Sequence, residues 1–181
     1  MKPIISANCR IRHPGHFSVG QYSVIDDYSY FSTRVKVGKC SHIASGCSVA
    51  GGGKMLFTLG DYCSLSSGVK IWCSSDNYVN DVVALIPDPS WKIKNNLIKG
   101  NVKIGNYCAV GSNSVIMPKN NIPEGAIVGA LSFVPAGFKF KPWAVYAGIP
   151  VRFIKMRNRA GVMKQVRRME KKLKSGGRKK K

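Results

Sequence analysis

Histidine is the side chain that exchanges a proton most readily near neutral pH, and this sequence has three histidines, His13, His16 and His42. Any of them could serve as the general base of a catalysed reaction. A histidine on its own more often has a structural role, and a catalytic zinc site usually needs three protein ligands that converge. The structural context of each histidine must therefore distinguish a catalytic role from a structural one.

The six cysteines form no C-x-x-C pair, and no histidine stands beside them at the spacing of a zinc site. We interpret them as buried free thiols of a protein kept in a reducing compartment. The opening MKPIISANCRIRHPGH lacks the apolar core of a signal peptide, and the uncharged stretch AIVGALSFVPAGF is shorter than the roughly 20 residues that span a bilayer. The sequence thus predicts a cytoplasmic protein.

A period of six residues runs along most of the chain. Six is a multiple of two, so each hexad can be a short strand whose first side chain points inward and which ends in a turn. Small residues often stand four places after the inward one, where they would fit a crowded corner. The inward positions predicted in this way are Val19, Ile25, Phe31, Val37, Ile43, Val49, Leu59, Leu65, Ile71, Ile104, Val110, Ile116, Ile122, Val128 and Val134.

Three such strands make one triangular coil, and no single coil can bury its own apolar face. Coils must therefore stack, so that each strand pairs in parallel with its copies above and below. The repeat predicts a parallel β-helix. From about Ile5 to Lys139 the hexapeptide pattern resembles the left-handed β-helix acyltransferases. This resemblance implies the left-handed sense and a homotrimer with its sites between subunits, whereas a non-catalytic scaffold is the alternative.

The repeat is lost in the loop 72–103, which contains SSDNY and IPDPSW. A loop of this length inside a compact repeat is usually functional. The sequence of this loop is similar to that of acyltransferases that modify nucleotide-linked or polysaccharide sugars. By this resemblance Asp76 could remove or orient a substrate proton, and Asn77 and Asp81 could bind the sugar. The alternative is that these side chains only bond turns within the loop.

The segment FKFKPWAVYAGIPVRFIKMR, residues 138–157, resembles the coenzyme A segment of the same family. The resemblance implies an acetyl-CoA donor, with its adenine near a turn and its phosphates near basic side chains that suit them. Backbone N–H groups on successive coils would hold the pantetheine and the thioester. The expected cofactor-binding residues are Gly148, Ile149 and Pro150 for the adenine, Arg152, Lys155 and Arg157 for the phosphates, and Gly111 and Ala130 for the arm.

The segment KCSHIASG around His42 resembles a coil of the bacillosamine-type N-acetyltransferases in which a histidine faces the active site. This resemblance favours His42 as a catalytic base. Those relatives have a further histidine about nine residues earlier, where this chain has Thr33. A γ-class carbonic anhydrase would share the fold, but its zinc needs three converging histidines and His42 has no second histidine within the continuous repeat. We therefore expect no metal.

The end of the chain is strongly basic. Residues 152–181 hold 14 of the 29 basic residues and one of the eight acids, in a chain of formal charge +21. Val162, Val166, Met169 and Leu173 recur at helical spacing. The simplest interpretation is a helix packed on the prism. Contact with anionic lipid is the second, and non-specific nucleic-acid binding is the third; no specific nucleic acid is expected.

The sequence therefore predicts an all-β, left-handed parallel β-helix with a C-terminal α-helix, divided into residues 1–157 and a basic helix and tail, 158–181. We expect a homotrimeric, acetyl-CoA-dependent enzyme that N-acetylates an amino group on a nucleotide-linked sugar for surface polysaccharide (O-antigen) synthesis. It would act in the cytoplasm, with its tail at the inner face of the membrane. The alternatives are an O-acetyltransferase for a sugar hydroxyl and a non-catalytic, basic β-helix that binds polyanions.

Overall fold

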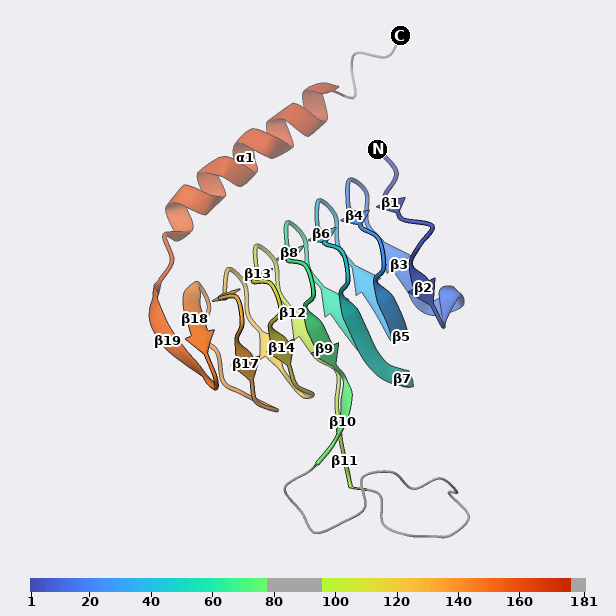
Figure 1. Cartoon of the computed structure of the whole chain (residues 1–181). Coiled ribbons are helices and arrows are strands. Elements are labelled where there is room, and N and C mark those ends of the chain that lie inside the picture. The colour runs from blue at the N-terminus through green and yellow to red at the C-terminus, as the bar shows by residue number, and fades with distance from the viewer. Residues whose placement is uncertain (78–95, 177–181) are drawn as a thin grey trace.

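The computed structural model describes residues 1–77 and 96–176 and has the form of a parallel β-solenoid of about 6 turns followed by one helix (Figure 1). Short strands lie on three faces of the prism and are joined by tight turns at its corners. The parallel β-helix and the C-terminal helix predicted from the sequence are both confirmed.

Each face is a ladder of strands contributed by successive coils. Face 1 consists of β1 (Ile4–Ile5), β4 (Val24–Ile25), β6 (His42–Ile43), β8 (Ser64–Leu65), β13 (Ala109–Val110), β16 (Ile127–Val128) and β18 (Ala144–Gly148). Face 2 consists of β2 (Arg10–Ile11), the start of β5 (Tyr30–Val37), the start of β7 (Ser48–Leu59), β9 (Lys70–Trp72), β14 (Val115–Ile116) and β17 (Phe133–Val134).

Face 3 has fewer strands than face 2. Strands β5 and β7 turn the corner between these two faces and contribute their ends to face 3. It consists of β3 (Phe17–Val19), the ends of β5 and β7, β12 (Val102–Ile104) and β15 (Asn121–Ile122). A 3-10 turn, Pro14–His16, lies between faces 2 and 3 at the first coil.

The core is a column of apolar side chains in exact strand register. On face 1, Ile25 pairs with Ile43, Ile43 with Leu65, Leu65 with Val110 and Val110 with Val128. All five are at most 1% exposed. Each fully buried side chain of this size stabilises the fold by about 1.5–3 kcal/mol, so the coils hold one another in place. The inward positions predicted from the hexad period are buried, except Val19 on the first coil, which is partly buried against the core.

Small polar side chains fill the corners, as the repeat predicted. Ser41 donates its hydroxyl to Gly60 O at 2.8 Å, and the thiol of Cys63 lies 3.0 Å from Gly105 O. These contacts satisfy carbonyl groups that the turns would otherwise leave buried and unpaired. All six cysteines are free thiols.

The long interruption of the repeat leaves the prism through an antiparallel pair. Strand β10 (Ser74–Asp76) pairs with β11 (Leu97–Lys99), and this hairpin projects from the side of the stack (Figure 1). The hexad register returns at β12, which pairs with the end of β7. The hairpin therefore starts one residue after β9, at a corner of the fourth complete coil.

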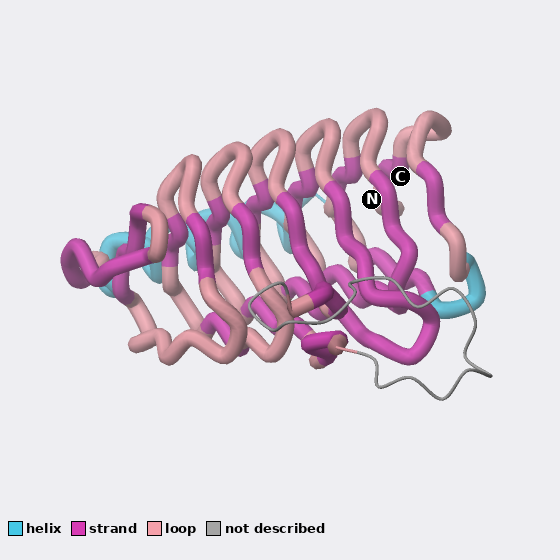
Figure 2. The backbone as a smooth tube through the Cα atoms, turned by 60° about the horizontal axis from the view of Figure 1, so that its bottom comes forward, coloured by secondary structure: helices cyan, strands magenta, loops and turns pink. Residues whose placement is uncertain are grey.

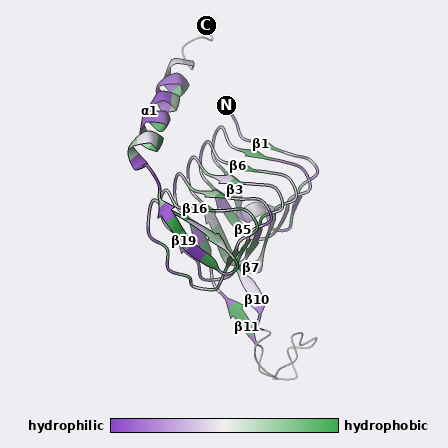
Figure 3. Cartoon of the chain, turned by 60° about the vertical axis from the view of Figure 1, so that its left-hand side comes forward, coloured by the Kyte–Doolittle hydropathy of each residue, from purple (hydrophilic) through white to green (hydrophobic). Residues whose placement is uncertain are grey.

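At its C-terminal end the chain reverses direction. Strand β19 (Val151–Met156) pairs antiparallel with β18, and helix α1 (Arg159–Gly176) then runs back along the prism toward its N-terminal end (Figures 1 and 2). In the hydropathy view α1 is mostly hydrophilic (Figure 3). Among the residues that the structure describes, no helix is long and apolar enough to cross a membrane.

Candidate active site

His42 is held on the outer surface of face 1 by the alternation of a strand. Its neighbour Ile43 is fully buried, so the imidazole must point outward. Asp26 follows Ile25 on the coil below, and its Oδ2 lies 2.7 Å from His42 Nε2. The two side chains are 47% and 41% exposed, so they are open to a ligand. A histidine and a carboxylate thus form a hydrogen-bonded pair on this face.

The pair has a defined proton arrangement. An ionised carboxylate can only accept hydrogen bonds, so Nε2 of His42 carries the hydrogen that Asp26 accepts. When His42 is neutral and bonded in this way, its Nδ1 is unprotonated and can accept a proton from a bound nucleophile. A base oriented by a third group in this way is the usual arrangement in proton-transfer catalysis. Asp26 was not among the residues predicted from the sequence.

A track of small side chains leads along face 1 from this pair. The residues that follow the inward positions on successive coils are Ala44, Ser66, Gly111, Gly129 and Ala147. Gly111 permits the close stacking, because a Cβ on it would lie 2.3 Å from Ala130 N. From β6 to β18 the track crosses four strand spacings of about 4.8 Å, or about 19 Å. The smooth surface suits an extended, flexible arm.

The backbone groups along this track differ in availability. The N–H of Gly111 donates to Val128 O at 2.8 Å, as part of the ladder between coils. This bond occupies the N–H, and the role expected for Gly111 stays a prediction. The N–H of Ala130 makes no hydrogen bond within the described ranges 1–77 and 96–176, and Ala130 is exposed. Ala130 remains the donor on this part of the track.

The track ends at the turn between β18 and β19. Gly148, Ile149 and Pro150 form this turn, and all three are exposed, with Ile149 78% exposed. Arg152 and Lys155 follow on β19 and are also exposed. An apolar turn beside two cations offers surface for a flat ring and charge for phosphate groups.

Asp76 lies away from His42. It is on the hairpin that leaves the prism after β9, at the end of face 2. It borders an open groove of about 580 Å³ whose apolar wall includes Trp72, Met117 and Phe133. Asn77 continues from β10, and its N–H donates to Asn96 O at 2.9 Å. Asp81 lies outside the described residues. Within one chain, the structure does not bring Asp76 and His42 together.

Comparisons with known proteins agree with this geometry. No family model matches the chain. It is 32% identical over 147 residues to the dTDP-4-amino-4,6-dideoxy-D-glucose acyltransferase of Escherichia coli, covering 80% of this chain and 73% of the relative. The chain belongs to the hexapeptide-repeat acyltransferase family.

Solved structures of N-acyltransferases have the same fold. AntD of Bacillus cereus, in complex with dTDP and 3-hydroxybutyryl-CoA, is 30% identical and has a TM-score of 0.78, with 93% of this chain and 87% of that chain covered. A variant of AntD in complex with dTDP-4-amino-4,6-dideoxyglucose and coenzyme A is 28% identical and has a TM-score of 0.82, covering 93% and 88%. This hexapeptide-repeat acyltransferase is therefore an enzyme of the acyl-transfer class.

Arg157 of this acyltransferase has structural partners instead of an open position for phosphate. Its Nη1 donates to Tyr107 O at 2.5 Å and to Gly125 O at 3.1 Å, and its guanidinium lies 5.8 Å from the centroid of the Trp143 ring. These contacts join the end of β19 to two turns of the prism. Arg152 and Lys155 are the exposed cations of this segment, whereas the phosphate contact expected for Arg157 stays a prediction.

Thr33 stands where the bacillosamine-type relatives have a histidine. Its side chain does not point outward in this acyltransferase. It is 1% exposed, and its hydroxyl lies 3.1 Å from Gly52 O and 2.6 Å from Met55 O. In the pairing with β5, residues 53–55 of β7 form an insertion, because Thr33 faces Gly52 and Arg34 faces Leu56. The Thr33 side chain thus holds this insertion against the prism. His13 lies against Gly53 of the same insertion, away from face 1. Within residues 1–77 and 96–176, His42 is the histidine placed beside a carboxylate.

Proposed function

We propose that this enzyme transfers an acyl group from a coenzyme A thioester to the amine of a dTDP-linked amino sugar. The observation that carries the proposal is the His42–Asp26 pair at one end of a smooth track whose other end presents an apolar turn and two cations. The similarity to N-acyltransferases whose complexes contain dTDP, a dTDP-linked 4-amino sugar and coenzyme A supports the choice of substrates.

The residues of the chain fit coenzyme A as the donor. Arg152 and Lys155 would face its phosphates, the turn Gly148–Pro150 its adenine, and the small side chains of face 1 its extended arm. The exposed N–H of Ala130 would donate a hydrogen bond to the arm or to the thioester oxygen. Hydrogen bonds of this kind stabilise charge that develops in the transition state.

The reaction requires one proton transfer beside the attack. The amine nitrogen forms a bond to the thioester carbonyl carbon, and the carbon–sulfur bond breaks as the coenzyme A thiolate leaves. The nitrogen loses a proton, which Nδ1 of His42 accepts, and the Asp26 carboxylate stabilises the imidazolium. The proton then passes to the thiolate or to solvent. Asp76 and Asn77 would bind the sugar from the hairpin of a neighbouring subunit, and Asp81 is proposed to bind the sugar as well.

Asp76 and His42 lie apart within one chain, so the proposed site requires a second subunit. A homotrimer would bring the two residues together. Exposed apolar residues on the sheet that contains face 1 and β19, such as Ile4 (53%), Phe153 (51%) and Met156 (57%), offer surface for contact between subunits. The assembly would place the hairpin of one subunit at face 1 of the next.

The basic helix offers a second surface. Lys164, Arg167, Arg168 and Lys171 are exposed on α1, and the sequence adds a run of basic residues after it. Such a surface attracts anionic lipid, with about 1 kcal/mol for each cation near the membrane. The enzyme would then act at the cytoplasmic face of the membrane, where sugars for surface polysaccharide are assembled.

The test is an assay for the release of coenzyme A thiol with a panel of nucleotide-linked amino sugars and their hydroxyl counterparts. We expect turnover with dTDP-linked amines and much slower turnover with the hydroxyl compounds. Equal turnover of hydroxyl compounds would assign the enzyme to O-acylation. Absence of turnover together with no retention on coenzyme A resin would contradict acyl transfer altogether.

A further inference from the structure

A pocket lies between α1 and the corner of the prism that leads into face 1. Its volume is about 240 Å³. The rings of Tyr62 and Tyr107 form its wall on the prism, and Val166 and Met169 form part of its wall on the helix. The remaining lining consists of apolar side chains and the thiols of neighbouring turns, with Ser64, Gln165 and Arg157 as its other polar members. The mechanism described above makes no use of it.

The pocket opens beside the reacting groups. Ser64 and Ala109 line it, and both lie on the outer surface of face 1. Ser64 is the direct register partner of His42, and Ala109 is the partner of Ser64 on the next coil. The pocket therefore begins one strand spacing, about 4.8 Å, from the strand that carries His42. A chain attached to a thioester at His42 would enter it directly.

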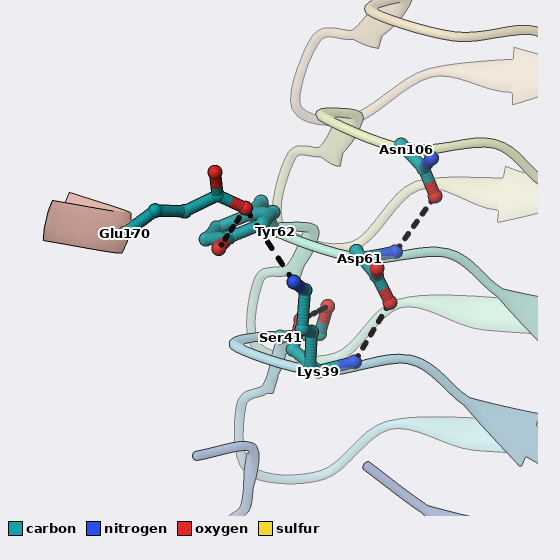
Figure 4. A network of polar contacts seen from close by, with 6 residues as sticks. All are labelled: Lys39, Ser41, Asp61, Tyr62, Asn106 and Glu170. Carbon is teal, nitrogen blue, oxygen red and sulfur yellow. Dashed lines mark hydrogen bonds and ion pairs between the residues drawn. The ribbon is translucent and has the colours of Figure 1, made fainter. Parts of the chain in front are cut away.

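The helix that roofs the pocket is held in place by specific contacts. Glu170 accepts a hydrogen bond from the Tyr62 hydroxyl at 3.1 Å and from Lys39 Nζ at 3.4 Å (Figure 4). Burial and the bond to Glu170 raise the pKa of Tyr62, so its hydroxyl stays protonated and can donate. Val166 is 6% exposed, which shows that the helix lies close on the prism.

The wall opposite the helix is rigid. Tyr62 and Tyr107 stack with ring centroids 5.7 Å apart, and Tyr107 stacks on Trp143 at 6.0 Å. Asp61 and Asn106 link the turns that carry the two tyrosines, because Asp61 N donates to Asn106 Oδ1 at 2.9 Å (Figure 4). A preformed apolar pocket of this kind binds a chain without the cost of first ordering its walls.

We propose that this pocket holds the acyl chain of the donor, and that the enzyme selects straight aliphatic acyl groups of about four to eight carbons over acetyl. The inference rests on the proposed acyl transfer at His42. An acetyl group would leave most of the volume empty. For comparison, an apolar cavity of about 150 Å³ takes up benzene, which has six carbons.

The test compares acetyl-, butanoyl-, hexanoyl- and octanoyl-CoA with one dTDP-linked amino sugar. Each methylene moved from water into an apolar pocket favours binding by about fourfold, so kcat/KM should rise by up to about 15-fold from acetyl to butanoyl and further to hexanoyl. A steady fall in kcat/KM from acetyl onward would overturn the pocket assignment while leaving acyl transfer intact. If none of the four donors were turned over, that result would instead contradict the proposed function.

A variant that fills the pocket separates this role from a structural one. Val166→Trp and, independently, Met169→Trp should lower the ratio of hexanoyl to acetyl kcat/KM by at least about 10-fold. Lys172→Trp, on an exposed position of the same helix, is the matched control and should leave the ratio unchanged. Thermal unfolding of each variant identifies any that fails to fold. A folded Met169→Trp enzyme with the wild-type ratio would refute the proposal.

Discussion

The pair formed by His42 and Asp26 predicts two losses of different size. In His42→Asn the general base is absent, so kcat should fall by about 10² to 10⁴. In Asp26→Asn the base remains but loses a charged partner. A hydrogen bond to a charged group contributes about 1.5–3 kcal/mol. Because the two side chains are 47% and 41% exposed, solvent screening reduces this to about 1–1.5 kcal/mol, or about 5- to 12-fold in kcat.

The assay is the steady-state release of coenzyme A thiol with a saturating amino sugar, together with direct titration of coenzyme A binding. Binding should be retained in both variants, since the cations of β19 lie five strand spacings away from His42. Asp27→Asn is the matched control, because it removes the same charge from the neighbouring residue, which accepts hydrogen bonds from the side chains of Ser6 and Asn8. Its kcat should stay within about twofold of the wild type.

The pH dependence gives a second measure of the same prediction. An amine that enters unprotonated needs less help when hydroxide can take its proton, so the loss in His42→Asn should shrink as pH rises. Full activity in His42→Asn at every pH would remove this histidine from the mechanism. Equal losses in Asp26→Asn and Asp27→Asn would show that only the overall charge matters.

Three further outcomes follow from the packing. Gly125→Ala places a Cβ at φ +72° and 2.3 Å from the Trp143 ring, so the free energy of unfolding should fall by about 2–3 kcal/mol in denaturant titration; an unchanged value would contradict this packing. The raised pKa of Tyr62 contributes stability that is present below its unfolded pKa of about 10 and is lost as pH rises, so alkaline unfolding of Glu170→Gln should respond less to pH than that of the wild type. Burial raises the pKa of Cys73 to about 11, so native protein at neutral pH should leave this thiol unlabelled by a thiolate-specific reagent, and rapid labelling would show that the coil opens.

The core could be predicted from sequence because the period of six is a local property. Ile25 and Ile43 are three hexads apart, as are Val110 and Val128, and each of the four is buried as expected. Handedness has no such local signal and came from the family resemblance. The extent of the interruption was also harder to place, because β12 starts at Val102 within the residues assigned to the loop.

The pairing of His42 with Asp26 can be predicted from the repeat. One coil corresponds to three hexads, which places His42 directly above Val24, and Asp26 stands two residues further along the same face. By contrast, nothing local shows that Arg157 would bond to Tyr107 O and Gly125 O, because that depends on how the chain crosses back over the last coils. The bond that occupies the Gly111 N–H likewise follows from stacking.

The regular stacking of coils along face 1 also makes the enzyme a molecular ruler. The separation between the base at β6 and the turn after β18 is a whole number of rungs, each contributed by one coil. Removing or duplicating one 18-residue coil between Val110 and Val128 would change that separation by one step of about 4.8 Å without altering either end. Donors with shorter or longer arms could thus be matched, in evolution or in the laboratory, by counting coils.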